Sequence, residues 1–222
     1  MEPMNRSTTA APRVSDGAHK SHYTCNNPRA WTGLVLATGM ALLPPLCAGG
    51  EATTKVGGDY AFSLYAGRLT DGDWEDTLGS SGMIDAYLLD AALSRTFWRA
   101  PDNAYSFELE GNVAKHFGDQ DHWELNLAVT GRWNRFPWND RVATSIAFGV
   151  GPSFASEVPK EEIRLNGSSE STLVYWHLEL TLGPPKENWA ALLRLHHRST
   201  GFGLMGDDGG SNAVTVGLRY YF

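Results

Sequence analysis

The feature that most constrains this chain is a two-residue alternation of apolar and polar side chains, clearest over residues 212–222. One face of this segment carries Asn212, Val214, Val216, Leu218, Tyr220 and Phe222, and the other carries Ala213, Thr215, Gly217, Arg219 and Tyr221. Successive side chains of a β-strand point to opposite faces, so a period of two predicts a strand with one apolar face.

The same alternation recurs upstream. It predicts further strands at residues 60–66, within 84–97, and at 105–113, 123–133, 142–150, 174–181 and 189–199. The faces of the 84–97 segment stay open, because Asp85 and Asp90 fall on opposite parities. The chain is therefore expected to be all-β, with eight antiparallel strands.

The polar faces of these strands carry charges of both signs. They are Glu108, Glu110, Glu124 and Glu179, and Arg132, Arg194, Arg198 and Arg219. A buried charge is tolerated only when it is paired, and an eight-stranded barrel has an interior just wide enough for such side chains. We therefore expect the charges to fill the lumen structurally, and the apolar faces to contact lipid. The pattern predicts a closed transmembrane β-barrel of the outer-membrane type.

Connections between the predicted strands alternate in length. The segments 98–103, 135–140 and 183–187 are short, whereas 69–83, 155–171 and 200–211 are longer and polar, and 117–121 is short. Outer-membrane barrels have short periplasmic turns and longer extracellular loops. The final aromatic residue also resembles the C-terminal recognition signature of such barrels. The alternating loop lengths thus predict the orientation of the barrel, with the long loops outside the cell and residue 199 at the outer-leaflet end.

Composition agrees with this class. Aromatic residues make up 11%, charged residues 19%, and the mean hydropathy is −0.30. A barrel can score as hydrophilic because half of each strand faces inward. The first 48 residues hold four basic and two acidic side chains, and the net charge is −7, so the remainder carries −9. This acidic balance argues against a nucleic-acid partner.

Residues 1–48 are expected to be a signal peptide, and residues 49–222 the barrel. Arg29 precedes an uncharged apolar run at 31–43 that is too short to span a membrane as a helix, and small residues follow it. Cleavage is expected after Ala48 or Gly50. The alternative to a signal peptide is a buried core helix, and the alternative processing site is a lipoprotein cysteine at Cys47. The other cysteine, Cys25, lies in the same segment, so the mature barrel contains no thiol.

The segment 189–199 carries the candidate chemistry. Its lipid-facing row runs Trp189, Ala191, Leu193, Leu195, and the same parity continues to His197 and Ser199. A neutral imidazole can take the proton of a serine hydroxyl and create a nucleophile. Asn212 begins the facing row of the next strand and could orient the ring. A polar pair at the membrane interface, and an asparagine that simply ends a loop, are the alternatives.

The motif His197-Arg198-Ser199, with Gly201, Asp208, Gly209 and the closing strand to Phe222, resembles the outer-membrane lipid A 3-O-deacylases. The C-terminal hairpin carries the resemblance best, and the barrel pattern agrees over the rest. It implies a His-x-Ser pair on the lipid-facing surface near the outer leaflet. Two departures matter: Asn212 stands where the family has a Glu, and Asp208 stands where the family has an Asn on the oxyanion side.

Each departure has a chemical consequence. Asn212 cannot hold an imidazolium by charge, and an ionised Asp208 accepts but does not donate hydrogen bonds. Its negative charge would oppose a developing oxyanion, so backbone amides near Gly201 or Gly203 would have to substitute. The pair Asp207-Asp208 lies in a Gly-rich turn and is expected to reflect turn chemistry, with a metal site as the alternative. No metal or other cofactor is expected.

The expected function is therefore an ester hydrolase that removes an acyl chain from lipid A, or lipopolysaccharide, in the outer membrane of a Gram-negative bacterium. The alternative is a structural or adhesive small barrel without catalysis, and a solute channel is weaker because the lumen is expected to be filled. The sequence leaves open whether the barrel forms a homodimer.

Overall fold

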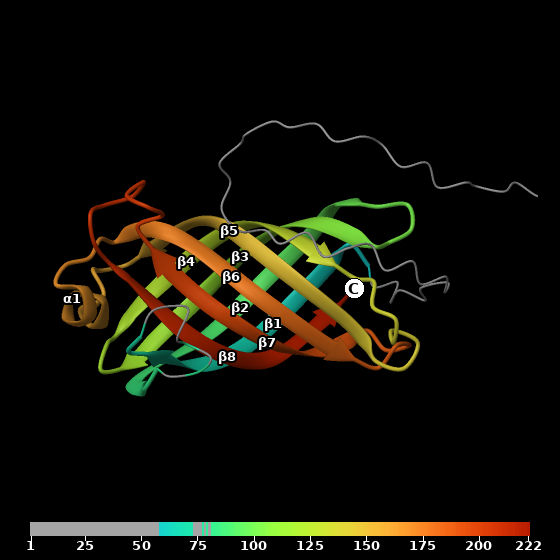
Figure 1. The fold of residues 1–222 in the computed structure, drawn as a ribbon, viewed down its shortest axis with the longest axis horizontal. Helices are drawn as coiled ribbons and strands as arrows, with labels where there is room; N and C mark the ends of the chain where they lie inside the picture. Colours follow the sequence, from blue (N-terminus) through green and yellow to red (C-terminus); the bar gives the residue numbers. More distant parts are fainter. Residues whose placement is uncertain (1–57, 73–76, 78, 80) are drawn as a thin grey trace, which may run out of the picture. The chain divides into compact units, whose positions relative to one another are not determined.

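The computed structural model describes residues 58–222 except 73–76, 78 and 80. The predicted signal peptide and its cleavage site lie outside these residues. In the described part, eight antiparallel strands close into one barrel in sequence order, with β1 paired to β8 (Figure 1). The strands are β1 (Tyr60–Thr70), β2 (Met83–Arg99), β3 (Tyr105–Gly118), β4 (His122–Trp133), β5 (Ala143–Ala155), β6 (Thr172–Gly183), β7 (Trp189–Ser199) and β8 (Gly210–Tyr221).

The two faces of the wall confirm the predicted alternation. On β4, Trp123, Leu125 and Leu127 are exposed, whereas Glu124 and Asn126 between them are buried. The other strands repeat the pattern, with large apolar side chains outside and polar or small ones inside. A barrel with an apolar exterior and a polar, filled interior is the outer-membrane type, because its outer face matches lipid hydrocarbon.

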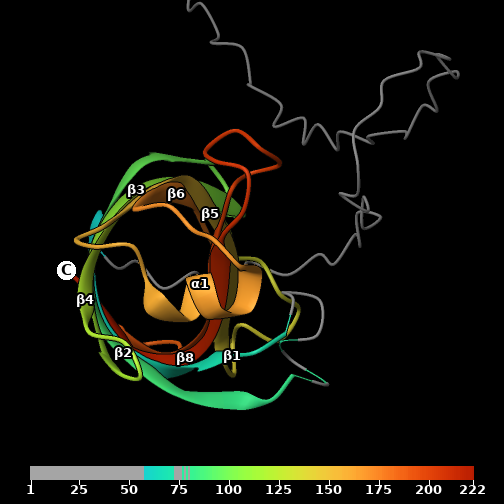
Figure 2. The same ribbon diagram turned by 90° about the vertical axis from the view of Figure 1, so that its left-hand side faces the viewer.

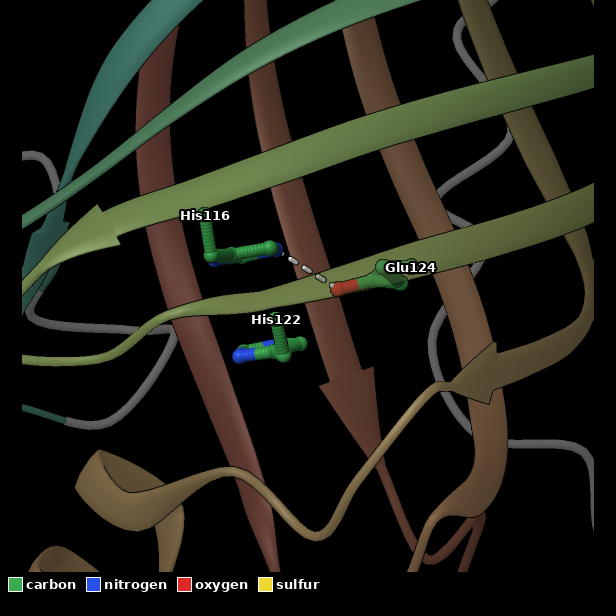
Figure 3. Close-up of side chains that lie close together, drawn as sticks. All are labelled: His116, His122 and Glu124. Atoms are coloured by element: carbon green, nitrogen blue, oxygen red, sulfur yellow. Dashed lines mark hydrogen bonds and ion pairs between the residues drawn. The ribbon is translucent and has the colours of Figure 1, made fainter.

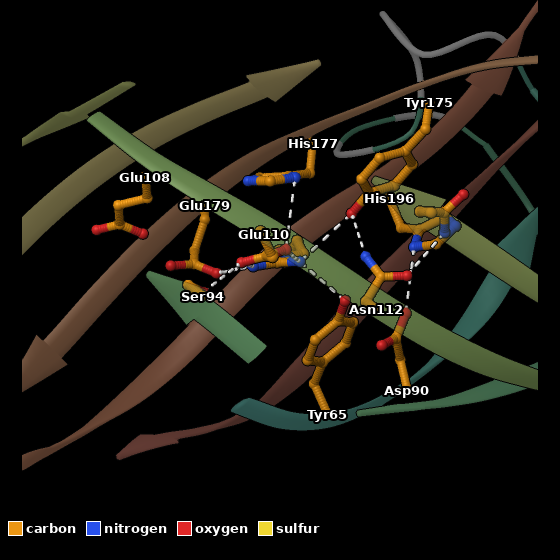
Figure 4. Close-up of polar contacts among 12 residues, drawn as sticks. Tyr65, Asp90, Ser94, Glu108, Glu110, Asn112, Tyr175, His177, Glu179 and His196 are labelled. Atoms are coloured by element: carbon orange, nitrogen blue, oxygen red, sulfur yellow. Dashed lines mark hydrogen bonds and ion pairs between the residues drawn. The ribbon is translucent and has the colours of Figure 1, made fainter. Parts of the chain in front are cut away.

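Arg194 of β7 is fully buried inside the filled lumen, where Figure 4 shows Glu110, Glu179, Tyr65 and Tyr175 converging from different strands. Its guanidinium donates to Glu110 Oε1 at 2.6 Å and to Glu179 Oε2 at 2.9 Å, and also to the hydroxyls of Tyr65 and Tyr175. Similar pairs link Glu108 to Arg132 and to Arg219, and Glu179 to Arg132. The predicted structural pairing of the lumenal charges is therefore confirmed.

Gly149 of β5 leaves the space that the His177 ring occupies. A Cβ at this position would lie 2.3 Å from His177 Cε1 and 2.5 Å from Thr130 Oγ1. We expect Gly149→Ala to lower the free energy of unfolding by about 1–3 kcal/mol through overpacking. The matched control is Gly131→Ala, because the nearest atom to a Cβ there belongs to Phe107 at 3.5 Å. Urea unfolding of both variants checks this, and equal losses would contradict it.

Strand β2 resolves the two aspartates whose faces were left open. Asp90 points into the lumen and is fully buried, whereas Asp85 lies on the outer face near the end of the strand. Arg68 of β1 donates to Asp85 at 2.6 Å, so the outward carboxylate is paired. The strand is also longer than the predicted segment, and its pairing with β3 shifts register between Thr96 and Trp98.

The connection predicted as a polar loop at 155–171 instead contains a short helix, α1 (Lys160–Asn166). Figure 2 shows α1 lying across the end of the barrel. Glu162 of α1 is buried there and accepts from Arg198, Ser211 and Ser169. Seven residues are too few for a helical period to show in the sequence, and the bonds to Glu162 are what fix the turn. Among the described residues, no helix is long and apolar enough to cross a membrane.

Candidate active site on the outer face

The outward row of β7 ends in His197 and Ser199, as its parity predicts. Their neighbours Arg194, His196 and Arg198 point inward and bind lumenal carboxylates. Because side chains alternate along a strand, this inward set fixes His197 and Ser199 on the outside. Strand β7 lies between β6 and β8, so both neighbours contribute to the surroundings of these two residues.

Cross-strand pairing builds the surroundings of His197. Its register partner on β8 is Asn212, and its partner on β6 is Trp176. The Trp176 and His197 rings are 4.3 Å apart between centroids and tilted by 32°. Opposite residues on adjacent strands have their Cβ atoms about 4.5–5.5 Å apart, close enough for side chains to interact directly.

A chain of two hydrogen bonds sets the protonation of the ring. Asn212 Nδ2 donates to the carbonyl oxygen of Gly72 at 2.9 Å, which leaves Asn212 Oδ1 facing His197 Nδ1 at 2.6 Å. An oxygen can only accept, so Nδ1 of a neutral ring must carry the proton. The Nε2 atom of His197 then holds the free lone pair that a general base needs.

His197 and Asn212 are recessed rather than open to the surroundings of the barrel. Their exposed fractions are 8% and 7%, whereas Leu193 on the same row of β7 is 40% exposed. The Trp176 ring and the loop backbone at Gly72 contact them. This shielding matters because a polar side chain on a lipid-facing surface is costly unless it is paired.

Ser199 is half-buried, and its hydroxyl accepts from the Gly201 amide at 3.4 Å. In the described part of the chain, no hydrogen bond joins Ser199 to His197. Proton transfer between them therefore requires the serine side chain or the ring to turn. Hydrogen bonds of this kind are often long or misaligned before substrate binds.

Of the three residues expected on the oxyanion side, all in the loop at 200–209, Gly201 is the one whose amide hydrogen-bonds to Ser199. Gly201 has a φ of 62°, a left-handed conformation suited to glycine, and its amide is directed at Ser199. The Gly203 amide donates to Thr200 Oγ1 at 3.4 Å instead. Asp208 is exposed and does not line the cavity that adjoins His197, Ser199 and Asn212.

A cavity of about 200 Å³ adjoins the three candidate residues. His197, Ser199 and Asn212 form one part of its wall, and the chain from Thr70 to Gly72 forms another. Asn166 of α1 also lines it and donates to the carbonyl oxygen of Gly210 at 2.9 Å. The lining is mostly polar, so the cavity suits a polar group rather than an acyl chain.

Some residues around the site and in the lumen were not predicted from the sequence. Gly72 accepts a hydrogen bond from Asn212, and the Trp176 ring packs against His197. Both contacts join segments far apart in the sequence or on different strands, which no local sequence pattern reveals. His116 and His122 flank the short connection between β3 and β4, and both point inward beside Glu124. The shared inward parity of these three residues was a signal in the sequence that could have identified them.

A scan against protein-family models finds no match, and no curated protein matches the sequence. Solved structures do match. The chain is similar to the outer membrane enzyme PagL, with 15% identity over 73% of this chain and 99% of that chain and a TM-score of 0.53. It is also similar to Neisserial surface protein A, with 11% identity over 73% and 96% of the two chains and a TM-score of 0.45. At these identities, the likeness to PagL concerns the fold.

Proposed function

We propose that this barrel is an ester hydrolase that removes an acyl chain from lipid A in the outer leaflet of a Gram-negative outer membrane. The observation that carries the proposal is the outward, recessed His197–Asn212 pair with Ser199 two residues along the same row. The resemblance of the hairpin to lipid A 3-O-deacylases and the fold shared with an outer membrane enzyme support it.

In the proposed reaction, Ser199 Oγ attacks the ester carbonyl carbon while His197 Nε2 takes the hydroxyl proton. The tetrahedral intermediate collapses, and the imidazolium returns the proton to the leaving alcohol. Water then attacks the acyl-serine by the same route and releases a fatty acid. Asn212 holds the ring and its tautomer, but as a neutral group it gives the imidazolium no charge compensation.

The Gly201 amide is the proposed donor to the developing oxyanion. It already points to Ser199 Oγ, so a small change of the serine rotamer would free it for the substrate oxygen. The polar cavity beside the site would hold the sugar end of the lipid, and the acyl chain would lie along the apolar outer wall. A substrate of this kind arrives by lateral diffusion, so the filled lumen is no obstacle.

The test is fatty-acid release by the purified barrel. Incubated with lipopolysaccharide in detergent micelles, the wild type should release one fatty-acid species, detected by gas chromatography. Vesicles of bacterial phospholipids serve as the second substrate, and no comparable release is expected from them. Release from phospholipids alone would show that the substrate is a phospholipid ester and not lipid A. No release from either substrate would refute the proposed hydrolase activity.

Asn212→Ala is expected to lower the hydrolysis rate by roughly tenfold or more, because the ring loses the acceptor that selects its tautomer; general-base catalysis as a whole contributes about 10²–10⁴-fold. Asn212→Asp keeps an acceptor oxygen and adds charge compensation, so its rate should equal or exceed that of the wild type. Initial rates on lipopolysaccharide at fixed pH decide the point. Equal rates for Asn212→Ala and the wild type would show that Asn212 does not position the ring.

A second candidate is a structural or adhesive barrel without catalysis. The specific observations in its favour are the hydroxyl of Ser199 turned to Gly201 rather than His197, and the neutral Asn212 in the orienting position. It predicts that replacing His197 by alanine leaves the lipid composition unchanged.

A further inference from the structure

A cluster of potential metal ligands lies inside the barrel, at the end that carries the longer loops (Figure 3). His116 of β3 and His122 of β4 are register partners, and their rings stack with centroids 4.2 Å apart. Glu124 lies two residues along β4 on the same face. One ligand atom from each of the three side chains falls within 4.8 Å of the others. The cluster faces the lumen, so it is separate from the outward site on β7.

We propose that His116, His122 and Glu124 bind a divalent transition-metal ion of the zinc class. Two imidazoles and one carboxylate are a ligand set that such ions accept in proteins, with bonds of about 2.0–2.2 Å. Ligands on one ion lie roughly 3.5 Å apart in that geometry, so modest side-chain rotations close the set. A water molecule would complete the coordination.

The independent observation is the state of His122. It is only 3% exposed, and its Nε2 is buried without a hydrogen-bond partner. A buried polar atom without a partner costs free energy, and most such atoms in native proteins are satisfied. A metal ion at the centre of the cluster would give this nitrogen the partner it lacks.

The groups behind the ligands fit the same ion. His116 Nε2 lies 2.9 Å from Glu124 Oε2, and its Nδ1 lies 3.0 Å from Gln120 Nε2, whereas Gln120 Oε1 has no partner. When Nε2 binds a metal, Nδ1 carries the proton, and a turn of the Gln120 amide presents Oε1 to accept it. The amide thus serves both states of His116.

The second oxygen of Glu124 is already oriented. His196 Nε2 lies 2.9 Å from Glu124 Oε1, which holds the carboxylate from the β7 side. Arg198 brings a positive charge to within 4.0 Å of Glu124, but Glu162 binds that guanidinium at 2.9 Å. This lumenal cation is therefore partnered by an acidic group outside the cluster.

The test is a Zn²⁺ titration of the folded full chain in detergent, purified without a histidine tag. His122→Ala removes the unpartnered ligand. His122→Phe removes the same nitrogens but keeps a ring to stack on His116, so it decides the matter if the alanine variant does not fold. The control is His177→Ala, because His177 is also a buried lumenal histidine without a hydrogen-bond partner but lies outside the cluster.

Wild type and His177→Ala should bind one Zn²⁺ per barrel by calorimetry, and the His122 variants should lose at least tenfold in affinity. A Co²⁺ absorption spectrum that is present in wild type and absent in His122→Phe should accompany this. Two results would overturn the site: no stoichiometric binding by the wild type, or equal affinity in the wild type and the folded His122 variant. Neither depends on whether the outer face hydrolyses lipid.

Discussion

His197→Ala, Ser199→Ala and the double variant are expected to show the same residual rate, about 10³-fold or more below that of the wild type. In a nucleophile–base pair neither group contributes to the rate without the other, so the rate reductions caused by the two single substitutions do not add in the double variant. Rates of fatty-acid release from lipopolysaccharide, measured for the four proteins at equal concentration, check this. The outward placement of both side chains on β7 is the structural basis for treating them as one unit.

The matched control for these variants is Ser153→Ala. Ser153 lies on β5 and is fully buried on the inward face without a hydrogen-bond partner, so its loss removes a hydroxyl from the barrel but not from the site. Its rate should match that of the wild type. A double variant much slower than either single variant would mean that the two residues act independently, which contradicts the proposed mechanism.

Arg194→Met is expected to lower the free energy of unfolding by about 3–5 kcal/mol, the largest stability effect we predict. The substitution preserves much of the side-chain volume but leaves Glu110 and Glu179 buried beside each other with one cation fewer. Glu179 keeps its pair with Arg132 and Glu110 keeps Arg219 at 3.6 Å, but both buried carboxylates lose their closest cation, and a buried charge is costly when it is incompletely paired. Urea unfolding in detergent, followed by tryptophan fluorescence, measures the loss.

The control for Arg194→Met is Arg135→Met, which removes a half-exposed arginine from a surface ion pair. Arg135 pairs with Asp102 at 3.1 Å, but both side chains are about half exposed, so the pair is expected to contribute less than about 1 kcal/mol. Similar losses in the two variants would show that the lumenal network does not stabilise the barrel as described. A more stable Arg194→Met would point the same way.

Most of the wall follows from the sequence because a strand has a period of two. In residues 212–222 the parity alone separates the outward Val216 and Leu218 from the inward Arg219, and the structure agrees. The exception was β2, where Asp85 and Asp90 have opposite parities. Only the position of Asp85 near the strand end, beside Arg68, explains an outward carboxylate.

The surroundings of the site were less predictable, because they depend on contacts between distant segments. The bond from Asn212 to the Gly72 carbonyl spans 140 residues, and it fixes which atom of the amide faces His197. The cover formed by α1 was missed, since Glu162 finds its partners on β7 and β8. Asp208 was expected on the oxyanion side from the resemblance alone, and its side chain is exposed in the loop.

The most direct measurement is mass spectrometry of lipid A from Gram-negative cells that express the wild type or Ser199→Ala at equal levels in the outer membrane. Hydrolysis by the outward serine predicts a lipid A species lighter by one acyl chain in the wild-type cells, and its absence in the Ser199→Ala cells. Identical lipid A profiles in the two strains would contradict the account.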